Sequence, residues 1–344
     1  MRGLREKISD MTTYSALRIG FFALKILPER FSLSLSRLLA DLGFYLFSSF
    51  RKRSVKNLSL ALGEGPTRQE LSGIVRKSLR NFLRDFAEIG LALKSSPEKI
   101  RAEIPATGRE HLDAALAKGR GVIVLSAHLG NFFLLGTRLA AEGYPTYVLV
   151  NNRRSGESQK LLDRYRLDVG QRTIPARPRS QAFRKMAEVL RQNGLAVLIA
   201  DEYRSGSGIH VPFFGRTVLA RRGPATLALR SGAAVVPIYL LRGAGGGLSL
   251  IIEPEMELSK SGRTKADVVE NTARITRWLE RTVRSYPDQW NWMNIRWQQA
   301  SAPDGRIISS LHNSGVIPAD PRASGRESRN PENSAQTGLP LPRQ

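Results

Sequence analysis

Short apolar runs of strand length alternate with segments of helical spacing from about residue 100 onward. Val122–Ser126 is an apolar, β-branched run that breaks at residues 128–131, and the apolar residues from Phe132 onward follow helical spacing. Similar patterns predict further strands at residues 147–150, 195–200, 235–240 and 248–252, and helices at residues 110–118, 181–192, 225–230 and 264–285. Strands that alternate with helices indicate an α/β fold with a mixed, mostly parallel sheet flanked by helices.

The N-terminal part of the chain has a different pattern, helical and rich in apolar side chains. Charged residues such as Arg18, Lys25 and Asp41 interrupt residues 12–50, so no uncharged run approaches the ~18 to 20 residues of a transmembrane helix. We also expect no signal peptide, because this segment lacks a small-residue cleavage site. We predict an amphipathic helical region that associates with a membrane, the basic residues that follow position 50 facing anionic headgroups. The alternative is amphipathic helices packed on the core.

Two changes of composition divide the chain. Thr67 and Glu70 form a capping-box pattern that begins another helix, which a Ser-Ser-Pro sequence at residues 95–97 follows. From about residue 300 the chain is rich in Ser, Pro, Gly, Asn and Arg and poor in aliphatic residues. We therefore predict a helical membrane-associating region over residues 1–96, an α/β domain over 97–298 and a disordered tail over 299–344.

The charge of the chain restricts its partners. Lys and Arg number 53 against 30 for Asp and Glu, a formal net charge of +23, which indicates nucleic acid, an anionic membrane surface, or an acidic carrier or substrate. The charges of the tail nearly cancel and no nucleic-acid-binding motif is present, so we expect no nucleic acid partner. The absence of cysteine excludes disulfides, thiolate zinc sites and cysteine nucleophiles, and no metal-ligand spacing occurs.

His128 is the first candidate for chemistry. It follows the predicted strand Val122–Ser126, and in open α/β sheets ligands bind at the carboxyl ends of the strands. A histidine there is suited to act as a general base near neutral pH, because its unperturbed pKa is about 6.5. The alternative is a histidine that only hydrogen-bonds the turn.

Four sequence blocks, taken together, resemble one family. They are the His-x-Gly-Asn core at residues 128–131, Val-Pro-Phe-Phe-Gly at 211–215, Gly-Ala-x-Val-Val-Pro at 232–237, and Pro-x-Gln-Trp with a later Arg-Trp at 287–297. With a basic turn before Asn57 and Leu58, this set over residues 15–298 resembles the bacterial lysophospholipid acyltransferase superfamily. The resemblance is to the branch of lipid A biosynthesis lauroyl and myristoyl acyltransferases.

This resemblance implies an enzyme that transfers a fatty acyl group from a thioester to a hydroxyl of a membrane lipid. The donor would be acyl carrier protein or acyl-CoA, and the acceptor a lipid A precursor or related glycolipid. The reaction would take place at the cytoplasmic face of the inner membrane without a metal or redox cofactor. His128 would deprotonate the acceptor hydroxyl, and the helix start at Gly130 and Asn131 would stabilise developing negative charge. Arg204 and Arg216 are candidates for binding an acceptor phosphate, with ordinary surface charge as the alternative.

The chain departs from the family pattern at the acid that would orient the histidine. Five residues after His128, where the family has Asp or Glu, this chain has Phe133, and Asn294 stands where the family usually has histidine. Either a carboxylate from elsewhere substitutes, or catalysis is slower, or the protein is an inactive relative that binds lipid. We favour a substitute at the end of strand 195–200, Asp201 ahead of Glu202, because parallel strands bring their carboxyl ends to one edge.

Overall fold

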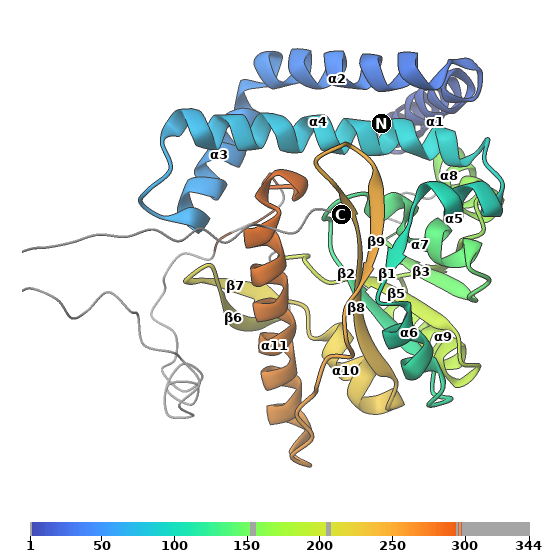
Figure 1. Ribbon diagram of the computed structural model, residues 1–344, viewed down its shortest axis with the longest axis vertical. Coiled ribbons are helices and arrows are strands. Elements are labelled where there is room, and N and C mark those ends of the chain that lie inside the picture. The colour runs from blue at the N-terminus through green and yellow to red at the C-terminus, as the bar shows by residue number, and fades with distance from the viewer. Residues whose placement is uncertain (1, 152–155, 204–207, 294, 296, 298–344) are drawn as a thin grey trace, which may run out of the picture. The chain divides into compact units, whose positions relative to one another are not determined.

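The structure is a computed structural model that describes residues 2–151, 156–203, 208–293, 295 and 297 (Figure 1). Within these residues seven strands form one sheet in the order β1-β9-β8-β2-β5-β3-β4. Its strands are β1 (Ala106–Thr107), β2 (Val122–Ser126), β3 (Thr146–Val150), β4 (Arg172–Pro175), β5 (Leu195–Ile199), β8 (Ala234–Arg242) and β9 (Leu248–Ile252). Neighbours are parallel except β8 and β9, which pair antiparallel. The mostly parallel α/β sheet predicted from the sequence is therefore confirmed.

Strand β2 lies in the centre of the sheet and is buried along its whole length. Ile123 and Leu125 face one hydrophobic core, and Val122 and Val124 face a second core on the opposite side. Burial on both faces explains why the strand is a continuous apolar run instead of an alternating one.

Helices cover both faces of the sheet, as predicted. On the first face lie α9 (Arg179–Arg191), α10 (Gly223–Ser231) and α11 (Thr264–Ser285). On the second face lie α5 (Pro97–Glu103), α6 (Arg109–Leu116), α7 (Phe132–Ala141) and α8 (Glu157–Asp168). Trp278 and Leu279 of α11, and Leu135 and Leu139 of α7, are examples of the fully buried side chains that these helices contribute.

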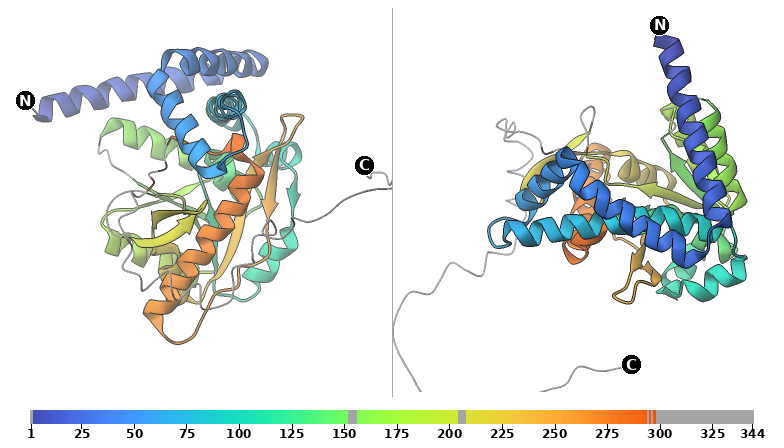
Figure 2. Two further views of the ribbon diagram at one scale, coloured as in Figure 1. Left: turned by 90° about the vertical axis from the view of Figure 1, so that its left-hand side faces the viewer. Right: turned by 90° about the horizontal axis from the view of Figure 1, so that it is seen from above.

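Four helices precede the sheet: α1 (Arg2–Ile26), α2 (Glu29–Leu46), α3 (Ser48–Leu62) and α4 (Arg68–Ala92). The capping box at the start of α4 is confirmed, since the Thr67 hydroxyl accepts the Glu70 amide and the Glu70 carboxylate accepts the Thr67 amide. Helix α4 lies across the carboxyl edge of the central strands, and α2 packs on its outer side (Figures 1 and 2). None of the helices among the described residues is long and apolar enough to cross a membrane.

The structure adds elements that the sequence patterns do not predict. Strands β6 (Ile209–Phe213) and β7 (Arg216–Ala220) form a separate antiparallel hairpin against α11 (Figure 1). Its two turn residues, Phe214 and Gly215, both have positive φ, 52° and 68°. Such a turn normally carries Asn or Asp at its first position, and phenylalanine there concealed it. Strand β1 has two residues, and β4 has a single aliphatic residue, Ile174, so neither gives an apolar run.

The predicted domain limits have different outcomes. The tail over residues 299–344 lies outside the described residues. The boundary between residues 96 and 97 coincides with the start of α5, where the Ser96 hydroxyl accepts the Lys99 amide, but the division into two domains there stays a prediction.

Candidate active site

The carboxyl edge of the sheet brings three strand ends together below α4. Strand β2 pairs with β5 on one side and with β8 on the other, all parallel, so residues that follow these strands share one edge. His128 follows β2 and Asp201 follows β5, while β8 continues past both to Arg242. This topology determines which polar side chains meet.

The turn that carries His128 requires a glycine. Gly130 has a φ of +56°, and a Cβ atom there would lie 2.0 Å from the Leu240 carbonyl oxygen. Asn131 then caps α7, because its side-chain oxygen accepts the Leu134 amide at 3.2 Å. The turn is thus held close against the end of β8.

The Asp201 carboxylate lies against the imidazole of His128. Its Oδ1 is 2.8 Å from His128 Nδ1, and its Oδ2 accepts the His128 backbone amide at 2.9 Å. The indole Nε1 of Trp290 donates to the same Oδ2 at 2.8 Å. With Nδ1 donating to the carboxylate, the imidazole has the tautomer in which Nε2 carries the lone pair.

Asp201 remains ionised in this environment. Burial, the largest influence, favours the neutral acid, but the charge of His128 and the hydrogen bonds from His128 and Trp290 outweigh it. The pKa of Asp201 therefore lies below its ordinary value. A buried carboxylate that accepts three N–H groups is suited to orient an imidazole and to stabilise its protonated form.

Phe133, the departure from the family pattern, belongs to an apolar cluster beside the histidine. Its ring centroid lies 4.0 Å from that of Phe132, 4.7 Å from Phe86 and 6.1 Å from Phe82. The Phe132 ring in turn meets the His128 imidazole edge-on at 4.8 Å. The position that holds a carboxylate in the family pattern is therefore occupied here by an aromatic side chain, and it packs with other aromatic side chains of α4 and α7 beside His128.

Gly130 and Asn131, which the sequence suggests as stabilisers of negative charge, make hydrogen bonds within the fold. The Gly130 amide donates to the Gln289 carbonyl and the Asn131 amide to the Leu240 carbonyl, both at 2.9 Å. The Asn131 side chain is buried, and its amide nitrogen donates to Glu88 at 2.9 Å. These donors therefore have acceptors within the fold, and the role of the helix start in stabilising charge on a substrate stays a prediction.

The remaining candidate residues lie away from the His128–Asp201 pair, or outside the residues that the structure describes. Glu202 is half-buried next to Asp201. Arg216 is exposed on β7, and its Nε donates to the Leu60 carbonyl of α3 at 3.0 Å. Arg204 lies outside the described residues. Within the described part of the chain, no group of three His, Asp or Glu side chains is placed to hold a metal ion.

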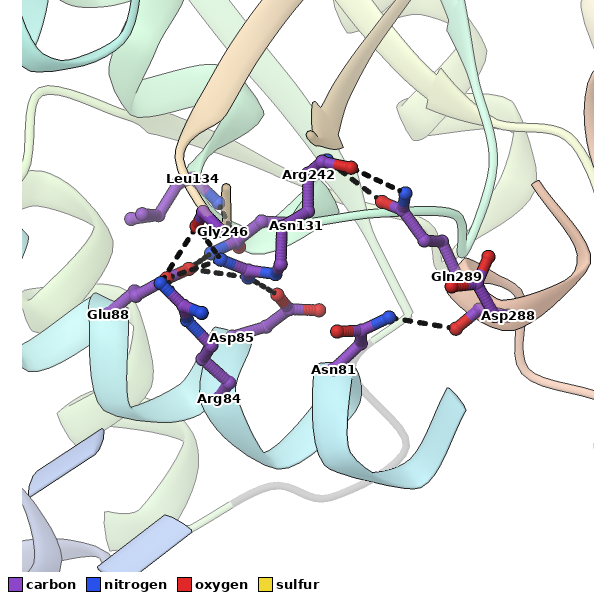
Figure 3. Close-up of polar contacts among 10 residues, drawn as sticks. All are labelled: Asn81, Arg84, Asp85, Glu88, Asn131, Leu134, Arg242, Gly246, Asp288 and Gln289. Carbon is purple, nitrogen blue, oxygen red and sulfur yellow. Dashed lines mark hydrogen bonds and ion pairs between the residues drawn. The ribbon is translucent and has the colours of Figure 1, made fainter. Parts of the chain in front are cut away.

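Sequence reasoning missed the residues that surround the turn. The sequence places Trp290 only within the Pro-x-Gln-Trp block, and its pattern gives no role to Glu88 or Arg242. Figure 3 shows Glu88 of α4 and Arg242 of β8 meeting beside Asn131. The sequence did contain one signal of a buried ion pair: two acids, Asp85 and Glu88, lie three residues apart on the helical face that also holds Ile89.

Sequence comparison finds relatives that span most of this chain. A phosphatidylinositol mannoside acyltransferase of Mycobacterium tuberculosis is 27% identical over 301 residues, which cover 85% of this chain and 91% of the relative. A lipid A biosynthesis palmitoleoyltransferase of Escherichia coli is 25% identical over 265 residues, covering 72% of this chain and 79% of the relative. The bacterial lipid A biosynthesis acyltransferase family matches residues 5–299. Because this match spans nearly all of the α/β fold and its helical N-terminal region, the chain belongs to that family and is an acyltransferase.

Proposed function

We propose that this acyltransferase transfers a fatty acyl group from a thioester to a hydroxyl of a membrane glycolipid, with His128 as the general base. The observation that carries the proposal is the Asp201 carboxylate, 2.8 Å from His128 Nδ1 at the carboxyl edge of the sheet. Nε2 takes the hydroxyl proton while the hydroxyl oxygen attacks the thioester carbonyl carbon. The carbon–sulfur bond then breaks, and the departing thiolate takes the proton from the imidazolium.

Asp201 supports this reading over an inactive relative that only binds lipid. That alternative depended on the missing acid at Phe133. A carboxylate that holds the imidazole in one tautomer serves the purpose of that acid, although it comes from another strand.

The substrates are proposed from charge and from relatives. The names of the relatives give phosphatidylinositol mannoside and lipid A as acceptor classes, both of them glycolipids. For this chain we propose a lipid A precursor or related glycolipid as acceptor, with acyl carrier protein or acyl-CoA as donor. A net charge of +23 suits these anionic partners. Glu202, Arg204 and Arg216 remain candidates for acceptor binding.

Lipid mass spectrometry of cells with and without this chain tests the proposal. A gain of one acyl group on a single glycolipid is expected, and its fragmentation identifies both the acceptor and the chain length. Lipid profiles that stay identical, while the protein is present and folded, would contradict the function.

We further propose that α1 and α2 hold the protein at the cytoplasmic face of the inner membrane. The residues of α2 that face the protein are mostly small: Ser32, Ser36 and Ala40. Phe44 is the one large side chain among them. Other large apolar side chains of α2 are instead exposed, among them Phe31, Leu38, Leu39, Leu42, Tyr45 and Leu46, and α1 adds Ile19, Phe22 and Ile26. An apolar surface of this kind is typical of a membrane or protein contact, and the basic residues at the start of α3 favour anionic lipid.

Glutamate on this surface is expected to weaken membrane binding without unfolding the protein. The side chain of Leu46 is 66% exposed, so Leu46→Glu removes no internal packing, and the double change with Leu38→Glu extends the effect. Full burial of one leucine contributes about 1.5–3 kcal/mol, so we expect roughly tenfold weaker binding per substitution to vesicles of phosphatidylethanolamine and phosphatidylglycerol. Leu167→Glu on α8, where the leucine is 63% exposed, is the matched control. Equal binding to vesicles by all variants would contradict the assignment of this surface as the membrane contact.

Restoring the family acid at Phe133 is expected to bring no gain. Asp201 already occupies the Nδ1 side of His128, and Phe133→Glu places a charge among Phe82, Phe86 and Phe132. We expect turnover to stay level or fall, with a loss of roughly 1–3 kcal/mol in the free energy of unfolding. Turnover and Tm of the purified variant, compared with Phe133→Leu, check this. A strong rise in rate would mean that Asp201 does not serve the histidine.

A further inference from the structure

Four charged side chains meet between α4 and the end of β8, and we call them the α4–β8 ion cluster: Arg84, Asp85, Glu88 and Arg242 (Figure 3). The Arg242 guanidinium donates to Asp85 at 2.6 Å and to both oxygens of Glu88 at 2.6 and 2.8 Å. Arg84 donates to Glu88 at 2.9 Å. Burial raises the pKa of Asp85 to about 8, although Arg242 opposes it. Burying ions is costly and is weak support for stability, so the cluster calls for another explanation.

One arm of the cluster reaches the histidine turn through Asn131. Glu88 Oε2 accepts the Asn131 side-chain amide at 2.9 Å while the other oxygen binds both arginines. Asn131 lies three residues after His128, and its own oxygen caps α7. The position of Glu88 therefore fixes the end of the turn that begins at His128.

The second arm reaches the acid of the pair through the segment of residues 288–290. The Gln289 side chain makes two hydrogen bonds to the Arg242 backbone. Its Oε1 accepts the Arg242 amide at 2.9 Å, and its Nε2 donates to the Arg242 carbonyl at 2.8 Å. The Gln289 carbonyl accepts the Gly130 amide, and the next residue, Trp290, bridges to Leu129 and donates to Asp201. Both partners of the pair are thus tied to Arg242.

Helix α4 holds this segment from the other side. The Asn81 side chain donates to the Asp288 carbonyl at 2.9 Å, and the Ser78 hydroxyl donates to the Trp290 carbonyl at 2.7 Å (Figure 3 shows the former). Lys77 pairs with the Asp288 carboxylate at 2.6 Å. The segment that carries Trp290 is therefore held between α4 and the end of β8.

We propose that Glu88 and Gln289 are positioning residues that set the geometry of the His128–Asp201 pair. Glu88 does so through Asn131, and Gln289 through Gly130 and Trp290. This inference rests on the proposed function of His128 as a base. A displacement of a reacting group by about 1 Å costs on the order of 10²-fold in rate, so a network of this kind serves catalysis without touching substrate.

Two variants and a matched control test the proposal in the full chain. Gln289→Ala removes the two hydrogen bonds between the half-buried Gln289 side chain and the Arg242 backbone. Glu88→Gln keeps an acceptor for Asn131 but removes the charge that binds Arg242. Glu142→Gln is the control, because Glu142 is a nearly buried acid paired with Arg138 at 2.6 Å at the far end of α7. We expect kcat to fall roughly 10- to 100-fold in the two variants with KM unchanged, and the control to keep its kcat despite a similar loss of Tm.

A second readout does not depend on turnover. The proton between His128 and Asp201 is expected to give a low-field proton NMR signal that Asp201→Asn abolishes and that the two variants weaken or broaden. An unchanged signal and a kcat within twofold of wild type in folded Gln289→Ala would overturn the proposal. So would a rise in KM alone, or an equal loss of kcat in Glu142→Gln. Should wild type lack acyl transfer, the proposed function fails, whereas the NMR comparison still reports whether these residues set the pair. If Glu88→Gln does not fold, Gln289→Ala decides.

Discussion

Replacing His128 by alanine is expected to lower kcat about 10²–10⁴-fold, the range that general-base catalysis supplies. The side chain is partly exposed, so little buried volume is lost. Asp201 also keeps two donors, the backbone amide of residue 128 and the indole of Trp290, which the substitution does not remove. The fold should therefore persist while the proton acceptor disappears. Turnover of purified enzyme with acyl thioester and acceptor lipid measures the effect.

A second histidine provides the control for this experiment. His111 on α6 is similarly exposed and contributes nothing to the edge of the sheet where His128 lies, so His111→Ala should keep wild-type kcat. Near wild-type turnover in His128→Ala, with Tm preserved, would end the assignment of His128 as the base.

Replacing Asp201 by asparagine is expected to be nearly as damaging, although the two side chains have the same shape. An amide nitrogen facing Nδ1 favours the tautomer in which Nε2 carries the hydrogen, and that tautomer cannot accept a proton from the acceptor hydroxyl. In a serine-protease triad, the same substitution costs about 10⁴-fold in kcat. We expect a loss approaching that value, measured as kcat with KM reported separately.

The pKa of Asp201 adds a dependence on pH. Its pKa in the folded protein lies below the ordinary 3.8, so its ionised form stabilises the fold above that pH, and this contribution is lost as pH falls through the folded-state pKa. The stability difference between wild type and Asp201→Asn should therefore shrink as pH drops below about 4.

The control for the loss of turnover in Asp201→Asn is Asp267→Asn, which changes a buried acid hydrogen-bonded to Ser261 at the start of α11 and should keep full turnover. Equal losses of turnover in both variants would contradict a specific role for Asp201.

The local pattern of the sequence determined most of the fold. The β-branched apolar run Val122–Ser126 indicates a buried strand, and the structure has it as β2, buried along its whole length. The spacing of residues 264–285 predicted α11 with the limits that the structure has. The hairpin of β6 and β7 was missed, because its turn uses Phe214 where turn-forming residues are normally found.

For the site, the sequence identified His128 and, from the expected parallel pairing of two strands, named Asp201 as the acid that would reach it. This inference was possible because parallel pairing fixes where strand ends lie, and β2 does pair in parallel with β5. The exposure of the apolar face of α2 also went beyond the sequence pattern, since amphipathic spacing does not say which face meets the protein.

Only the tertiary structure decided what surrounds the pair. Trp290 lies 89 residues from Asp201 in the chain, and Glu88 lies 154 residues from Arg242, so neither contact leaves a periodic or local trace. The backbone amides of Gly130 and Asn131 likewise find their acceptors far away in the chain, at the carbonyls of Gln289 and Leu240, and the turn packs against the end of β8. Local sequence fixes secondary structure because backbone hydrogen bonds and side-chain spacing act over a few residues. The partners of a buried polar group depend on how distant elements pack, and burial then forces every donor and acceptor to find one.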